Sequence, residues 1–368
     1  MSKEARSDGI RLSHRGQRLV DSPKIPAYIA EHFARAGQAW DPQLRPDGYV
    51  SLCIAENKLH NDDLIARLAD YEVPAPALGY DAMTGNPEFR RRLASFMGRS
   101  FLGRTFDADQ IAVLAGAGSV LEILCYAICD TGDGVLIPTP SYAGFWPDLE
   151  MRDELNIVRV DCTSEDDFQL TPERLDAAMD SAECPVTALL FTTPNNPLGR
   201  VYTADELREV VAWTERRGIH LIVDEIYALS VFGEREFVSV ASLRPHLGDG
   251  VHVVWAFSKD FGASGLRCGV LVSENRAVIE AVGGLAYWSA CSGHTQHLLS
   301  ELVADEAAVD AHVAGMQHKL GQAYRRATGA LDAVGVAYLP AEAALFLICD
   351  LRAYLDAPTW EAERALWR

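Results

Sequence analysis

The feature that most constrains the fold is a series of short apolar runs, rich in β-branched residues, that alternates with helical patterns from about residue 110. Almost continuous apolar character is typical of strands buried on both faces of a sheet. The alternation therefore predicts an α/β fold in which helices cover both sides of a mostly parallel sheet. The expected strands lie within six runs: 111–118, 134–140, 186–194, 219–227, 251–258 and 268–274.

Helical patterns lie between these runs. Residues 119–129 place apolar side chains at a spacing of three to four. Residues 203–217 have the start and stop signals of a helix, because Thr203 and Glu206 make a capping-box pattern and Gly218 follows the last turn. The spacing therefore predicts that a helix connects the third strand to the fourth.

The pattern changes after residue 295. Residues 296–335 are helical throughout, and 343–351 resembles a strand of a separate unit. We therefore expect a large domain at 60–295 and a smaller α+β domain built from 1–59 and 296–368. The sequence stops within an amphipathic helical pattern, so we expect the natural chain to continue.

Composition excludes several classes of function. The formal net charge of −19 argues against a nucleic-acid partner, which requires a basic face. No apolar run is long enough to span a bilayer, and the N-terminus lacks the apolar stretch of a secretory signal. The eight cysteines are scattered, so we expect reduced thiols and a cytoplasmic protein. Cys125 and Cys129 would share a helix face, but no second pair follows to complete a metal site.

Polar side chains of particular types follow the expected strands. Gly118 and Ser119 follow the first strand and open a helix, whose N–H groups form an anion site. Asn196 and Asp224 follow later strands, and Ser258 and Lys259 end another. Because the carboxyl ends of parallel strands meet at one edge of a sheet, we expect these side chains to surround one ligand.

This set of groups fits pyridoxal 5'-phosphate (PLP). Lys259 supplies the amine for the aldehyde, and Asp224 holds the ring nitrogen protonated. Asn196 and Tyr227 would donate to the ring phenolate, and Tyr142 would stack on the ring. The phosphate would take Gly118, Ser119, Ser258 and Arg267, whose planar fork suits phosphate. Each residue alone has an ordinary structural interpretation; their joint occurrence in order favours the cofactor.

The chain resembles fold-type I PLP enzymes of the class I/II aminotransferase superfamily, through the stretches TPNNPLGRVYTADEL, IVDEIY and SKDFGASGLRCG. Within that superfamily it is most similar to 1-aminocyclopropane-1-carboxylate (ACC) synthases, through LCIAENKL, GNPEFRRRLASFM and LIPTPSYAGFWPDLE. The resemblance implies a sheet of seven strands and a homodimer with shared active sites. It also places Glu56, Tyr142, Asn196 and Met83 at the substrate.

The resemblance implies a reaction on S-adenosylmethionine (SAM) or a close analogue. The substrate forms an aldimine, Lys259 removes the α proton, and methylthioadenosine leaves from Cγ. The product then either closes a ring or forms a Cγ bond with a second substrate in specialised metabolism. A plain amino-acid aminotransferase is the alternative, and a PLP-binding regulator without turnover is a third, which the acidic charge argues against.

Three positions depart from the ACC synthase pattern. Met83 stands where those enzymes have a tyrosine that reaches the neighbouring subunit's site, while Tyr80 fits the aminotransferase pattern for a phosphate contact. Ala256 replaces a phosphate-binding serine. No arginine for the substrate carboxylate is identified before Arg368. These departures weaken the case for ring closure more than the case for SAM.

Overall fold

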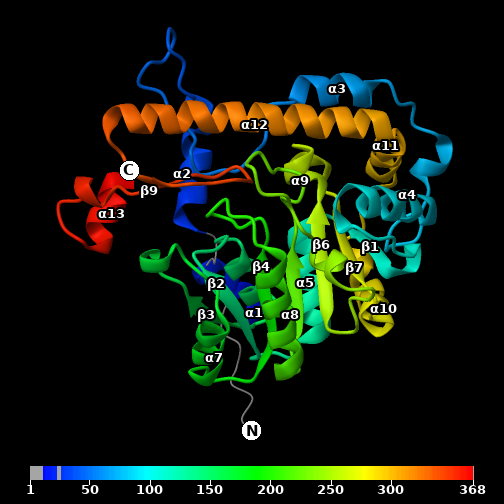
Figure 1. Ribbon diagram of the computed structural model, residues 1–368. Coiled ribbons are helices and arrows are strands. Elements are labelled where there is room, and N and C mark those ends of the chain that lie inside the picture. The colour runs from blue at the N-terminus through cyan, green and yellow to red at the C-terminus, as the bar shows by residue number, and fades with distance from the viewer. Residues whose placement is uncertain (1–10, 23–25, 368) are drawn as a thin grey trace.

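Seven strands form one sheet in the computed structural model, which describes residues 11–22 and 26–367 (Figure 1). Their spatial order is β1-β7-β6-β5-β4-β2-β3. β7 runs antiparallel to both neighbours, and the other adjacent pairs are parallel. The bounds are β1 Ile111–Leu114, β2 Gly134–Thr139, β3 Asn156–Asp161, β4 Val186–Thr192, β5 His220–Asp224, β6 Val251–Ala256 and β7 Gly269–Ser273.

Thirteen α-helices accompany the sheet within the described residues. Their bounds are α1 His14–Asp21, α2 Ala27–Arg35, α3 Asn61–Ala69, α4 Pro87–Met97, α5 Ala117–Ile128, α6 Phe145–Glu150, α7 Pro172–Asp180, α8 Ala204–Arg217, α9 Phe257–Asp260, α10 Arg276–Leu285, α11 Gly293–Ala304, α12 Glu306–Val334 and α13 Trp360–Trp367. No helix in the described ranges combines the length and the hydropathy that a membrane span requires.

The sheet separates two hydrophobic clusters, as the alternation of side chains along a strand requires. Val113 packs into the cluster that contains α4 and α8, and its neighbour Leu114 packs into the cluster that contains α5 and α10. Helices therefore cover both faces, and the predicted mostly parallel α/β sheet is confirmed.

The sheet contains one strand that the apolar runs did not predict. β3 lies at the edge, where Val160 is fully buried but Asn156 and Arg159 are exposed. A strand with one neighbour carries fewer apolar residues, so its composition resembles that of a loop. The predicted helix at 203–217 is confirmed with its capping box and with Gly218 at its end.

The C-terminal region differs in detail from the prediction. The expected continuous helix is two helices, since Asp305 breaks the pattern and caps α12 by accepting from Ala308 N at 3.0 Å. In place of one strand over 343–351, β9 (Ile348–Cys349) pairs with β8 (Tyr338–Leu339), and Ala343 forms an isolated bridge with Val231. The division into two domains stays a prediction, and residues 1–10, 23–25 and 368 lie outside the described residues.

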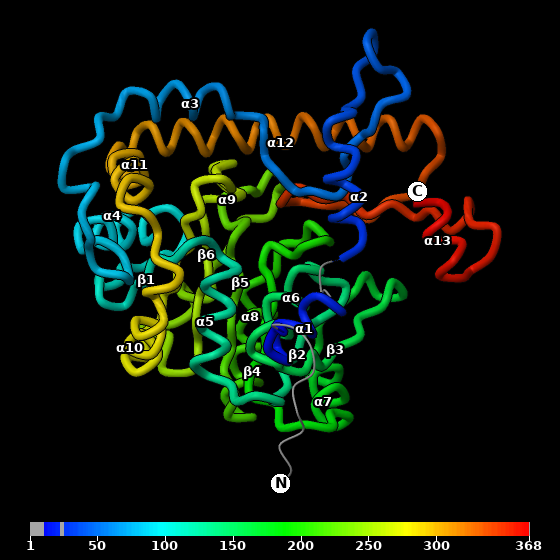
Figure 2. The backbone as a smooth tube through the Cα atoms, turned by 180° about the vertical axis from the view of Figure 1, so that it is seen from behind, coloured from blue at the N-terminus to red at the C-terminus, as the bar shows by residue number. Residues whose placement is uncertain are grey.

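Figures 1 and 2 agree that α3 lies alongside the long helix α12, with α9 below them at the end of β6. The segment that leads into α3 therefore passes close to the carboxyl ends of the parallel strands. This arrangement brings residues before position 61 to the same edge of the sheet as α9.

Candidate active site

A cavity of about 250 Å³ lies at the carboxyl ends of the central strands, beside the first turn of α5. It brings together most of the polar residues that the sequence singled out. Its predicted members are Gly118, Tyr142, Asn196, Asp224, Tyr227, Ser258, Lys259 and Arg267. The topology explains the convergence, because these residues end or follow parallel strands or open a helix at one edge of the sheet, and Arg267 precedes the antiparallel strand β7, which begins at that edge.

Lys259 lies in α9, the short helix that directly follows β6. Its Nζ donates a hydrogen bond to the backbone carbonyl of Ala55 at 2.6 Å. Burial lowers the pKa of Lys259, while the charges of Glu56 and Asp224 act in the opposite direction. A lysine with a lowered pKa is more often the neutral amine that a nucleophile or a base requires.

Asp224 is the last residue of β5, and its side chain is buried. Its carboxylate accepts from the N–H of Ile226 at 3.2 Å and from the Thr192 hydroxyl at 3.5 Å, a weak contact. Burial raises the pKa of Asp224 to about 7. A buried carboxyl with such weak partners suits a cationic N–H group of a ligand in the cavity.

Two further side chains line the cavity next to Asp224. Tyr227 is buried, which raises its pKa well above the ordinary value, and a hydrogen bond with Asn196 opposes that shift. Tyr142 follows β2 and is 45% exposed, with its ring 5.4 Å from that of Phe145 in an edge-to-face contact. The cavity therefore offers an amide and a phenol beside an open aromatic face.

The end of the cavity at α5 is suited to an anion. Gly118 lies in the first helical turn, where N–H groups lack partners within the helix. Arg267 lies beside this turn, and its guanidinium donates to the carbonyls of Ser264 at 3.1 Å and Ala115 at 3.3 Å. Ser258 is a third member of the lining.

The structure leaves four predicted residues off the cavity wall. Ser119 turns its hydroxyl back to the carbonyl of Ala115 at 3.3 Å. Glu56 pairs with Lys58 at 2.9 Å, although its charge acts on Lys259. Tyr80 is 99% exposed, and Met83 packs against the core cluster around α5.

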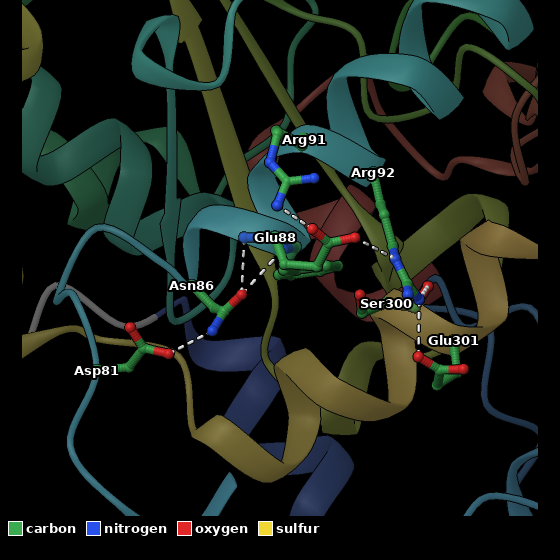
Figure 3. A network of polar contacts seen from close by, with 8 residues as sticks. Asp81, Asn86, Glu88, Arg91, Arg92, Ser300 and Glu301 are labelled. Atoms are coloured by element: carbon green, nitrogen blue, oxygen red, sulfur yellow. Dashed lines mark hydrogen bonds and ion pairs between the residues drawn. The ribbon is translucent and has the colours of Figure 1, made fainter. Parts of the chain in front are cut away.

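The loop that carries Tyr80 and Met83 is held in place by a polar network at the start of α4 (Figure 3). Asn86 caps this helix and also donates to the carboxylate of Asp81. Glu88 pairs with Arg92 at 2.9 Å, and Arg92 reaches Glu301 of α11 at 2.7 Å. Tyr80 is therefore exposed on a loop whose end is fixed by hydrogen bonds and ion pairs.

Sequence reasoning missed several members of the lining, of which Asp148 has the most chemistry. Burial and the charge of Glu122 raise the pKa of Asp148 to about 6. It lies in α6 beside the first turn of α5, with a carboxylate oxygen 3.4 Å from the position that a β-carbon on Gly118 would take. Its sequence context, an acid in the first turn of a helix, carries no signal of a site.

Comparisons with known proteins agree with this geometry. A family profile described as aminotransferase class I and II matches residues 49–368. The chain is 36% identical over 343 residues to 1-aminocyclopropane-1-carboxylate synthase 6 of Arabidopsis thaliana, covering 88% of this chain and 69% of the relative. The corresponding synthase of Glycine max is 35% identical, with 89% and 72% covered.

Solved structures show the same fold. The aspartate aminotransferase from Thermus thermophilus with maleate superposes with a TM-score of 0.77, at 24% identity over 98% of this chain and 90% of that chain. The expected fold-type I architecture is therefore confirmed. The chain belongs to the aminotransferase class I and II family and is a PLP-dependent enzyme that resembles the ACC synthases.

Proposed function

We propose that the cavity holds PLP and that Lys259 binds its aldehyde. Asp224 would pair with the ring nitrogen, Asn196 and Tyr227 with the ring oxygen, and Tyr142 with the ring face. The observation that supports this fit is the buried, weakly partnered carboxylate of Asp224 in the same cavity as the Lys259 amine. The phosphate group would lie between Arg267 and the first turn of α5, with Gly118 and Ser258 as further partners and Ser119 contributing through its backbone N–H.

The proposed substrate is SAM or a close analogue, because the relatives identical at 35–36% are ACC synthases. When bound, PLP joins the substrate amine and draws electrons from the bonds at Cα. The neutral amine of Lys259 would take the α proton, and its lowered pKa increases the neutral fraction. Loss of that proton would allow methylthioadenosine to leave from Cγ.

Glu56 is the proposed substrate contact outside the cavity lining. Its carboxylate is 43% exposed and near enough to raise the pKa of Lys259, so it would face a substrate bound above the lysine. The later fate of the substrate carbon chain is either ring closure or bond formation at Cγ with a second small molecule.

The test is to add SAM to the cofactor-loaded chain and to measure methylthioadenosine by chromatography. We expect its release, and mass spectrometry of the remaining products would distinguish ring closure from bond formation with a second substrate. A loaded chain that binds SAM without releasing methylthioadenosine would overturn the proposal.

Amino-acid transamination is the second candidate function, which Tyr80 and the family profile favour. It predicts that an ordinary amino donor converts the cofactor to its amine form, with loss of the visible absorbance of the lysine-bound cofactor. Methylthioadenosine release from SAM without this loss would favour the first candidate.

We also propose a homodimer in which Tyr80 reaches the phosphate group in the partner's site. Tyr80 is 99% exposed on a loop tied by Asn86 and Asp81, whereas Met83 is packed against the core. Tyr80 is therefore the better candidate for a contact between subunits. Light scattering of the loaded chain should give twice the chain mass, and a fully active monomer would refute the shared site.

A further inference from the structure

Residues 55–60, which we call the strap, lie directly against the helix that carries Lys259. The carbonyl of Ala55 accepts the hydrogen bond from Lys259 Nζ at 2.6 Å. A β-carbon on Gly262 would collide with the carbonyl oxygen of Asn57, and Gly262 has φ +64°. The strap and the turn after α9 are therefore in backbone contact, at a site where glycine is required.

The other side of the strap is held by α12. Lys319 Nζ donates to the carbonyl of Leu59 at 2.8 Å and lies 3.4 Å from the carboxylate of Asp63, in the first turn of α3. The same carboxylate contacts Nδ1 of His60 at 3.0 Å. Lys319 therefore joins the strap and the start of α3 to α12 through one ammonium group.

His60 ends the strap in a buried position, with 10% of its side chain exposed. Its ring lies 5.2 Å from that of His312 on α12. The ring of His312 in turn stacks on Phe261 at 4.8 Å, and its Nε2 lies 3.3 Å from the carbonyl of Asp260. One helix thus contacts both the strap and the turn that follows Lys259.

From these contacts we propose that Lys319 is a positioning residue for the active site. Its ammonium group holds the strap down, and the strap in turn holds the Ala55 carbonyl at the amine of Lys259. The strap also carries Glu56, whose charge acts on the same amine. The proposal rests on the proposed role of Lys259 in binding the cofactor, which the Lys259→Ala variant tests separately.

The experiment compares Lys319→Met with the unmodified chain. Methionine keeps the unbranched apolar stem and removes the charged donors, and Lys319 is 40% exposed, so the substitution leaves the packing of α12 intact. Lys319→Arg restores a charged donor. The matched control is His318→Ala. His318 is the residue before Lys319 on α12, and the substitution removes its exposed contact with Gln322.

Two measurements test the proposal without any substrate: hydrogen exchange in buffer alone, and the capture of added PLP. Hydrogen exchange of a peptide covering residues 52–62 should be at least about tenfold faster in Lys319→Met, because the strap opens more often. The pH dependence of the rate at which cofactor-free protein captures added PLP reports the pKa of the Lys259 amine. Its midpoint should shift by about half a unit in Lys319→Met, because the strap supplies the Ala55 carbonyl and the Glu56 charge that act on this amine.

The control and the arginine variant should match the unmodified chain in both measurements. Unchanged exchange and an unchanged midpoint in Lys319→Met would overturn the proposal. Equal effects in His318→Ala would also overturn it, because the cause would then be a general loosening of α12. If the Lys259→Ala variant still captures PLP covalently, the proposed role of Lys259 is wrong. The hydrogen-exchange result would still test whether Lys319 holds the strap.

Discussion

The guanidinium group of Arg267 lies directly against the α-carbon of Gly116, so closely that a β-carbon at position 116 would stand 2.8 Å from its Cζ atom. Gly116 is the residue before α5 and has φ +97°, a conformation that favours glycine. Because the two residues share this space, the backbone of the anion-binding turn sets the position of the arginine.

Replacing Gly116 by alanine should therefore displace Arg267 and weaken the binding of the cofactor phosphate. We expect the Kd for PLP to rise at least about tenfold, since hydrogen bonds to charged groups contribute about 1.5–3 kcal/mol. Fluorescence or absorbance titration of cofactor-free protein measures this change.

Gly132→Ala is the control for backbone strain. Gly132 has a similar φ of +90°, but a β-carbon there would meet open space. Both variants should lose free energy of unfolding, of about 1–3 kcal/mol, but only Gly116→Ala should also lose PLP affinity. Equal losses of PLP affinity in the two variants would contradict the steric argument.

Lys259→Ala should abolish both turnover and the visible absorbance of the lysine-bound cofactor. Loss of a positioned base costs on the order of 10²–10⁴ in rate, and loss of the covalent attachment adds to it. The fold should persist, because within the described residues the amine makes a single hydrogen bond, to the Ala55 carbonyl. Absorbance, circular dichroism and product assays check the three outcomes, and retention of full activity would show that another residue is the base.

Asp224→Asn should weaken cofactor binding while it preserves the shape of the side chain. Removing one partner of a buried charge pair costs about 2–5 kcal/mol, so the Kd for PLP should rise by at least about 30-fold. Asp161→Asn, at the exposed end of the edge strand β3, serves as the control and should leave the Kd unchanged. An equal Kd in the unmodified and Asp224→Asn chains would exclude a pairing with the ring nitrogen.

Stability at acid pH should depend on His252, at the far end of the sheet from the cavity. Its Nε2 lies 3.0 Å from Nδ1 of His220, and its Nδ1 lies 2.9 Å from the Ser273 hydroxyl. Burial, and then the charge of His220, lowers the pKa of His252 from 6.5 to about 3. Between these values the unfolded chain binds more protons than the folded chain does.

The free energy of unfolding should therefore fall as the pH is lowered through this window, by about 1.4 kcal/mol per pH unit from this residue. Urea denaturation at a series of pH values between 4 and 7 measures the free energy of unfolding. Its slope against pH should be shallower in His252→Asn than in the unmodified chain. His318→Asn, on an exposed face of α12, should keep the full slope. Identical slopes in all three proteins would rule out a buried neutral His252.

The parts of the fold and site that the sequence predicted are those with a local physical signal. Apolar runs predict buried strands, and Thr203 and Glu206 mark a helix start through their own hydrogen bonds. Lys259 and Asp224 were predictable because a parallel sheet gathers the residues that follow its strands at one edge. These signals need no knowledge of distant contacts.

The rest depends on contacts between distant segments. Ala55 and Lys259 are 204 positions apart, and nothing near Ala55 indicates that its carbonyl receives the amine. Asp148 becomes part of the cavity because α6 packs beside α5, which no spacing in the sequence encodes. β3 was missed because one buried face of an edge strand carries too few apolar residues.

The contact between Arg267 and the carbonyl of Ala115 spans 152 positions in the sequence. The pairing of β1 with β7 spans a similar sequence separation. At a synthesis rate of about 5–20 residues per second, the anion-binding turn leaves the ribosome about 8–30 s before its arginine. The nascent chain therefore lacks a complete anion site until Arg267 has emerged, and we expect cofactor capture to be a late event in synthesis.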